Sequence, residues 1–178
     1  ETFLPYYQQT VGFDKVPTAF FSPPTETRHW FHQGPLGDSF SGYFESNHSP
    51  EYWQEDPSVL QRTAVQASFL VRLPARSRRE ALRALRGQTL RTELYALDGS
   101  PRQNRPYTVT ESLSAVSGLP GTRPSDETLP ADPTALPATD WRLRVFFPFH
   151  FAQRTSQWER GEQPLVSFSR TDKYDAFG

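Results

Sequence analysis

Residues 77–112 read SRREALRALRGQTLRTELYALDGSPRQNRPYTVTES, and this stretch decides the fold. Ser77 and Glu80 have the spacing of a capping box, in which each side chain bonds the free backbone N–H of the other residue. Ala81 begins a short apolar stripe at helical spacing, and Gly87 stands where a left-handed C-terminal cap is needed. The pattern predicts one short helix over residues 78–86.

From residue 88 the apolar residues alternate with a period of two, which predicts a strand. One face of this strand would carry Leu90, Thr92, Leu94 and Ala96, and the other Arg91, Glu93 and Tyr95. Asp98-Gly99 is a strong hairpin signal, because glycine adopts the positive φ of the turn without strain. Residues 107–110, YTVT, supply a β-branched return strand. The helix and the hairpin over residues 88–112 therefore form an α+β unit at the core.

This unit can be tested by truncating one side chain on either strand of the hairpin. If Leu94 and Tyr107 are buried, Leu94→Ala or Tyr107→Ala is expected to lower the free energy of unfolding by about 2–5 kcal/mol. Thermal melts without any loss in both variants would argue that the hairpin is not the organising core.

Prolines and apolar alternation divide the rest of the chain into segments. No helical period survives the prolines of residues 1–26, which are expected to be an extended segment. Residues 27–113 form a β-rich region that holds the helix and the hairpin. Residues 114–139 contain five prolines and few apolar residues, which predicts a long flexible loop, and residues 140–178 are expected to form β-strands. The predicted fold class is mainly β, antiparallel, with one short helix.

Further strands are predicted from β-branched and aromatic runs at residues 27–33, 68–73, 141–147, 153–159 and 165–170. Pro74 and Pro148 are expected to end the second and the third of these strands. Residues 37–48 suggest an ordered loop, and Pro50 favours a single helical turn after it. Residues 59–67 fit a short helix or a strand equally well.

The length and composition of the chain exclude several classes of partner and site. The 178 residues suit one domain, and the net charge of −1 gives no argument for nucleic acid or an anionic membrane as a partner. The arginines of residues 76–86 are expected on the solvated face of the helix. No apolar run approaches the roughly 20 residues that span a bilayer. The absence of Cys excludes disulfides and thiolate metal sites, and the absence of Met even at position 1 suggests a piece of a longer protein.

No residue pattern argues for catalysis, so no catalytic, cofactor-binding or metal-binding residue is assigned. His29 and His32 are three residues apart in a predicted strand, which places them on opposite faces without metal-ligand spacing. An acidic cluster with aromatic neighbours has the composition of a sugar-binding or glycosidase cleft; it contains Glu45, Glu51, Tyr52, Trp53, Glu55 and Asp56. A glycosidase needs two carboxylates held about 5–9.5 Å apart, which linear crowding does not establish. We expect instead an acidic surface loop pinned by Trp53.

Several short segments of the sequence are typical of one protein family. They are residues 28–34 RHWFHQG, 52–57 YWQEDP, 79–87 REALRALRG, 93–100 ELYALDGS, 106–111 PYTVTE and 158–160 WER. Together they resemble the middle region of the B subunit of insecticidal Tc toxin complexes. Residues 174–178, YDAFG, resemble the start of the Tyr-Asp repeats of Rhs proteins. The resemblance covers residues 27–178 except the loop 114–139, and the helix and hairpin are its most specific part.

The resemblance implies a structural role, with no enzymatic activity and no cofactor. In such toxins this region joins a β-propeller to a hollow shell of Rhs-type strands, which encloses a cytotoxic C-terminal polypeptide until a pore-forming A subunit delivers it. The implied partners are the rest of the B subunit, the C subunit and the A subunit, and the implied location is secreted. Direct membrane insertion is not implied, whereas unpaired sheet edges would favour self-association.

An extracellular carbohydrate- or protein-binding β module is the alternative, with Trp30, Tyr52 and Trp53 as the contact residues. Exposed aromatic rings in a shallow groove would favour this alternative. Buried rings would favour the shell segment. An enzyme with an acidic site at residues 45–56 ranks behind both.

Overall fold

A five-stranded antiparallel sheet dominates the computed structural model, which describes residues 22–117 and 145–171. The strand order is β1-β4-β5-β6-β7, and these strands span Thr25–Phe31, Thr89–Ala96, Thr108–Ser117, Phe147–Gln157 and Leu165–Arg170. A separate hairpin pairs β2 (Leu36–Asp38) with β3 (Gly42–Phe44). The two helices are α1 (Ala64–Arg72) and α2 (Ala75–Ala84), and a 3₁₀ turn covers Ser49–Glu51. The predicted fold class is confirmed, but two short helices are present rather than one.

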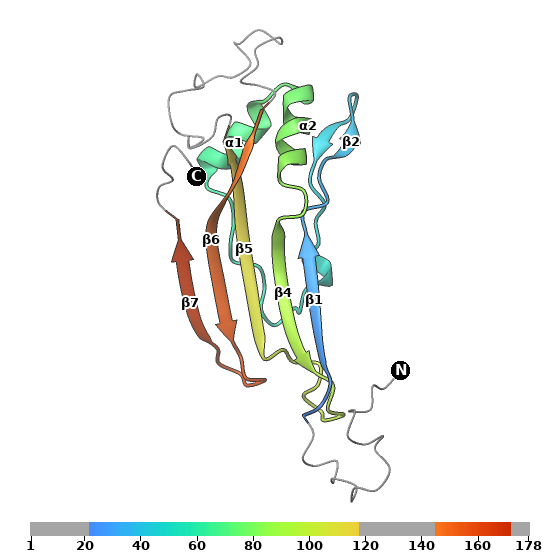
Figure 1. Ribbon diagram of the computed structural model, residues 1–178, viewed down its shortest axis with the longest axis vertical. Coiled ribbons are helices and arrows are strands. Elements are labelled where there is room, and N and C mark those ends of the chain that lie inside the picture. Colours follow the sequence, from blue (N-terminus) through green and yellow to red (C-terminus); the bar gives the residue numbers. More distant parts are fainter. Residues whose placement is uncertain (1–21, 118–144, 172–178) are drawn as a thin grey trace, which may run out of the picture.

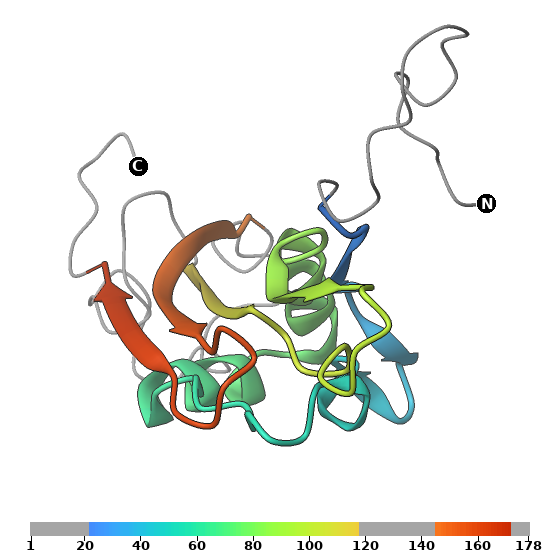
Figure 2. The ribbon, with the colours of Figure 1, turned by 90° about the horizontal axis from the view of Figure 1, so that it is seen from below.

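The sheet is long and curved, with both helices at one end of its strands. Figure 1 shows α1, α2 and the β2–β3 hairpin gathered at that end. Viewed along the strands in Figure 2, the sheet bends around α1 and the chain that precedes this helix. One face of the sheet is therefore covered by residues from the first half of the chain.

Helix α1 contradicts the strand predicted at residues 68–73. Its N-terminus has a capping box, in which Thr63 Oγ1 accepts from the backbone of Gln66 and Gln66 Oε1 accepts from the backbone of Thr63. Phe69 and Leu70 then fall on the buried side of the helix. Short apolar runs do not distinguish a strand from a buried helix, and here the cap selects the helix.

Helix α2 begins three residues before the start predicted for it and ends two residues before the predicted end. Pro74 stands at its N-cap, and Ser77 is buried inside the helix instead of capping it. Gly87 has φ +84°, so the left-handed position expected after the helix is confirmed. The side chain of Arg78 donates to the carbonyl oxygen of Leu70 at 2.9 Å, which ties the two helices together.

The hairpin predicted over residues 88–112 is present as β4 and β5, with Arg91 opposite Glu111. Strand β5 continues to Ser117, four residues into the segment expected to be a loop, and the rest of that segment lies outside the described residues. The more buried face of β4 is the one that carries Arg91, Glu93 and Tyr95. Leu94 and Tyr107 are only half-buried.

The later strands partly match the prediction. Strand β7 coincides with residues 165–170, whereas β6 is longer than expected and contains Pro148 as its second residue. Proline is tolerated there because β7 pairs only from Ala152 onward, which leaves β6 with one described neighbour at Pro148. The earlier part of the predicted strand at residues 141–147, like residues 1–21 and 172–178, lies outside the described part of the chain.

The interior has an apolar part and a polar part. The apolar cluster lies between the helices and the adjoining end of the sheet; it contains Phe69, Leu70, Leu73, Ala81, Leu82, Leu85 and Val116. Tyr43 of β3 packs against this cluster, which corrects the expectation of a loop at residues 37–48. The middle of the sheet is covered differently, by charged and aromatic side chains. None of the described helices is long and apolar enough to span a membrane.

Candidate functional site

Three buried charged residues form a row across the middle of the sheet. Arg91 on β4 is the register partner of Glu111 on β5, which is in turn the partner of Arg154 on β6. Register partners in antiparallel strands point to the same face, so the positive, negative and positive charges lie side by side. All three side chains are buried, and Arg91 has no exposed surface.

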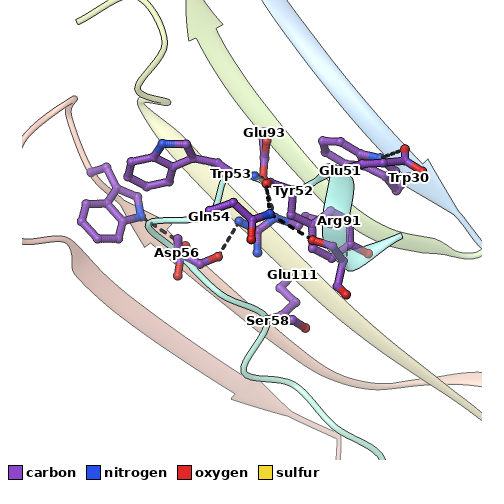
Figure 3. A network of polar contacts seen from close by, with 12 residues as sticks. Trp30, Glu51, Tyr52, Trp53, Gln54, Asp56, Ser58, Arg91, Glu93 and Glu111 are labelled. Carbon is purple, nitrogen blue, oxygen red and sulfur yellow. Dashed lines mark hydrogen bonds and ion pairs between the residues drawn. The ribbon is translucent and has the colours of Figure 1, made fainter. Parts of the chain in front are cut away.

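Glu93 lies two residues further along β4 and binds several groups. It accepts a hydrogen bond from Arg91 Nε at 2.6 Å and another from the Tyr95 hydroxyl at 2.7 Å. It also accepts from the backbone N–H of Trp53 at 3.0 Å, as Figure 3 shows. Burial and the hydrogen bond to Glu93 raise the pKa of Tyr95. Glu93 therefore joins its own strand to the segment that crosses it.

That crossing segment, residues 53–59, is here called the strap. Arg91 Nη2 donates to the carbonyl oxygen of Asp56 at 2.8 Å. Glu111 accepts from the hydroxyl of Ser58 and from the backbone N–H of Val59 at 3.1 Å. Figure 3 shows the strap passing over the strands with these side chains between them. The sheet therefore binds the strap through charged side chains on β4 and β5.

Asp56 provides the contact between the strap and β6. Its carboxylate is buried, forms an ion pair with Arg154 and accepts from Trp158 Nε1 at 3.2 Å. Arg154 Nε lies 3.3 Å from Glu111 Oε2, so one guanidinium contacts two carboxylates from different segments. Each buried charge in this group thus has an opposite charge beside it, as burial requires.

The aromatic residues proposed for ligand binding pack within the molecule. Trp30 is 9% exposed, and its Nε1 donates to Glu51 at 2.9 Å. Its ring meets the Tyr52 ring edge to face, with the ring centroids 5.1 Å apart. The guanidinium of Arg91 lies over the Tyr52 ring, 4.8 Å from its centroid. Trp53 meets Trp158 edge to face at 4.9 Å. Trp30 is buried, whereas Tyr52 and Trp53 are half-buried and are among the residues that line a pocket of about 580 Å³.

The acidic cluster predicted from the sequence is divided among separate partners. Glu51 binds Trp30, Glu55 binds Arg105 at 2.7 Å, and Asp56 binds Arg154. Glu45 binds Arg62 and His32, the latter at 2.9 Å from the histidine Nδ1. These contacts indicate structural roles for all four carboxylates. The structure does not place any two of them as a pair facing an open cleft.

Glu45 and its two partners form a compact ion cluster at the end of β1 and β3. Burial would raise the pKa of Glu45, but the bonds from His32 and Arg62 outweigh this effect and lower the pKa to about 2. His32 is buried whereas His29 is exposed, so the two histidines do not share a site. Across residues 22–117 and 145–171, no three His, Asp or Glu side chains lie together as metal ligands.

Two residues of the Trp158-Glu159-Arg160 segment make contacts that fix the tight turn after β6. Arg160 has φ +60° and donates to Asp98 Oδ2 at 2.6 Å, which lowers the pKa of Asp98. Trp158 meanwhile binds Asp56 on the strap. This turn is therefore fixed both to the strap and to the turn between β4 and β5.

Sequence reasoning missed the charged row because the register was unknown. The alternation of residues 90–96 favoured the apolar face of Leu90 and Leu94 as the core side of β4, whereas the structure buries the opposite face. Arg91 next to Glu93 on one face was the available signal, since an opposite-charge pair allows burial. The pairing of Arg154 with Glu111, 43 residues earlier in the chain, has no local signature.

Comparison with known proteins identifies similar chains. Residues 80–135 match the family described as "Insecticide toxin TcdB middle/C-terminal region". A chain in the structure of the Photorhabdus luminescens Tc holotoxin pore is 25% identical with a TM-score of 0.53; the match covers 86% of this chain and 6% of that one. A chain in the crystal structure of TcdB2-TccC3-TEV is 26% identical with a TM-score of 0.53, over 85% of this chain and 6% of that one. No curated protein matches the chain.

These matches confirm the resemblance to the B subunit of insecticidal Tc toxins that the sequence predicts. The chain spans only about one sixteenth of the length of the solved chains that it resembles, as the 6% coverage gives. The chain is thus similar to one segment of a much larger toxin component.

Proposed function

We propose that this chain is a non-enzymatic wall segment of a Tc-type toxin B subunit. In this role it forms part of the β-shell that encloses a cytotoxic C-terminal polypeptide. The observation that carries the proposal is the similarity over 85–86% of the chain to chains in Tc toxin structures, together with the match at residues 80–135.

The sheet has the form that a wall segment requires. Among the described strands, β1 pairs only with β4 and β7 pairs only with β6, so the outer edge of each is open to a further strand. Every residue of β7 is exposed, including Leu165 and Phe168. Such edges attract other strands unless they are covered, and the continuing wall of a shell would cover them.

The buried charges support a structural role rather than catalysis. Arg91, Glu111 and Arg154 are shielded from solvent and bind the strap, so they are not presented to a substrate. A catalytic acid or base needs access to the proton that it transfers. We therefore assign no catalytic, cofactor-binding or metal-binding residue to the chain.

The partners in this proposal are the rest of the same B subunit, a C subunit and a pore-forming A subunit, in a secreted complex. The similar structures carry the printed names TcdB2-TccC3-TEV and Tc holotoxin pore, which fit such an assembly. In the parent protein, residues 27–113 would form the start of the wall and residues 140–178 would lead into Tyr-Asp repeats.

Cryo-electron microscopy of the full-length product of the gene that encodes this chain tests the proposal. The product would be purified alone and after co-expression with TccC3 as a C-subunit probe. The expected result is a hollow β-shell with residues 22–171 in its wall, and resistance of the C-terminal part of TccC3 to trypsin in the complex. A compact product without a hollow shell, or residues 22–171 outside the wall, would reject the proposal.

A glycan-binding module receives less support from the structure. Its contact residues would be Trp30, Tyr52 and Trp53, and their rings contact each other, Arg91 or Trp158.

A further inference from the structure

The tip of the β2–β3 hairpin exposes one aromatic side chain almost completely. Phe40 is 98% exposed, the largest value among the exposed large apolar residues of the described chain. The hairpin projects beyond the end of β1 beside α2, as Figure 1 shows. An isolated exposed phenylalanine needs no special explanation, but the way in which this one is held does.

Asp38 fixes the turn that carries Phe40. Its Oδ1 accepts from the backbone N–H of Phe40 at 2.8 Å, and from the backbone N–H and the hydroxyl of Ser41 at 2.7 and 2.9 Å. Gly37 also fits tightly, since a Cβ there would lie 2.2 Å from the carbonyl oxygen of Gly42. The turn thus has one well-defined shape before any contact is made.

The base of the hairpin is anchored to the body of the molecule. Tyr43 packs against the apolar cluster, and Glu45, which follows β3, is paired with Arg62 and His32. Motion of the tip as a flexible loop is therefore restricted from both ends. A turn whose backbone is already fixed loses little conformational entropy when the side chain that it carries is buried by a partner, which is a property of an interface anchor.

Further apolar side chains surround the same projection. Leu36 and Phe44 on the two hairpin strands are exposed, and so is Phe31 at the adjoining end of β1. Beside them a pocket of about 590 Å³ lies between the hairpin and α1, with Phe44 and Val71 among its lining residues. This surface continues the open edge of β1, where the next part of a shell wall would lie.

We propose that the β2–β3 hairpin is a docking knob, and that its Phe40 ring inserts into an apolar pocket of a neighbouring part of the same parent chain. This inference rests on the proposed function. The solved chains that this one resembles continue far beyond the matched segment, which is 6% of their length, so the parent chain itself offers the nearest large surface. The pocket that receives Phe40 would be apolar and wide enough for one aromatic ring.

The test compares Phe40→Ala in the 178-residue chain and in the full-length gene product. In the short chain the substitution should leave the melting temperature unchanged, because Phe40 has almost no contacts to lose. In the full-length product, amide hydrogen exchange at residues 38–42 should be at least about tenfold slower than in the short chain, and Phe40→Ala should remove that protection. Val65→Ala, another exposed apolar residue but on α1, is the matched control and should change neither protein.

Three results would overturn the proposal that the hairpin is a docking knob. Equal exchange in the two proteins would show that nothing covers the hairpin, and a lower melting temperature of the short variant would make Phe40 part of its own fold. Dimers of the short chain that Phe40→Ala dissociates would assign the surface to a second copy instead. A hollow shell without protection of the hairpin would reject only the knob, whereas protection in a product without a shell would reject only the wall-segment function.

Discussion

Arg91 has no exposed surface, and its guanidinium binds Glu93 and the carbonyl oxygen of Asp56. Removing two such charges from water has a large desolvation penalty, which their attraction only partly offsets. The pair is therefore weak evidence for stability in itself. Its clearer effect is to fix where the strap crosses β4, because both members of the pair bind the backbone of the strap.

Arg91→Met is expected to lower the free energy of unfolding by about 3–5 kcal/mol, because Glu93 would stay buried without its opposite charge. Urea denaturation measures the loss. Arg76→Met on the exposed side of α2 is the matched control and should change stability by less than about 0.5 kcal/mol. Equal, small losses in both variants would contradict the role given to the buried charge.

The ion cluster of Glu45 makes the stability depend on pH. The pKa of Glu45 is about 2 in the folded chain and close to 4.3 in an unfolded one. Since the folded value is the lower one, the stabilisation is complete above about pH 4.5 and is lost as the pH falls towards 2. The stability advantage over Glu45→Gln should shrink by about 2–3 kcal/mol across this interval.

Urea denaturation of both proteins between pH 2 and 5 would reveal this difference, with Glu162→Gln in an exposed turn as the control. A constant gap between the wild type and Glu45→Gln over the whole range would refute the assignment.

At the scale of elements, local signals predicted the hairpin and the left-handed glycine after α2 well. Asp98-Gly99 and Gly87 require particular backbone angles, and such requirements are visible in the sequence. The second half of α1 was predicted as a strand and its first half was left open between a helix and a strand, because the apolar run fits both periods and the cap at Thr63 was overlooked. The expectation that the Leu94 face of β4 is the core face was wrong, since burial of the other face depends on Arg154 and Asp56, which are distant in sequence.

Leu85→Ala is expected to destabilise the chain by about 2–5 kcal/mol, because Leu85 is 1% exposed within the apolar cluster. Leu97→Ala, at 46% exposure just after β4, should lose less than about 1 kcal/mol. Leu94 is half-buried, so Leu94→Ala should fall between the two. Calorimetric melts of the three variants give the order, and a larger loss at Leu97 than at Leu85 would place the core elsewhere.

The whole molecule combines a closed interior with open sheet edges. The helices and the strap cover one face of the sheet, whereas β1 and β7 each have one described neighbour. A segment that is built into a larger wall needs such edges, but the same edges are a liability for the segment in isolation.

The isolated chain is therefore expected to associate with increasing concentration through β7. Phe168, at 60% exposure, contributes apolar surface to that edge, and Phe168→Lys should keep the chain monomeric by charge repulsion. Val65→Lys is the control, because Val65 is also exposed but lies on a helix, where no backbone edge is offered. Sedimentation velocity over a concentration series measures the effect, and association that survives Phe168→Lys would exclude β7 as the contact.

The ion pair between Asp56 and Arg154 joins residues that are 98 positions apart. Contacts of this separation form late in folding, since a long loop must close before they are made. At a synthesis rate of about 5–20 residues per second, roughly 5–20 seconds pass between the two residues on the ribosome. During that time β4 and β5 can already pair, while the strap has no β6 to bind. A nascent chain is therefore expected to acquire its hairpin first, with Arg154 completing the fold only when the last strands emerge.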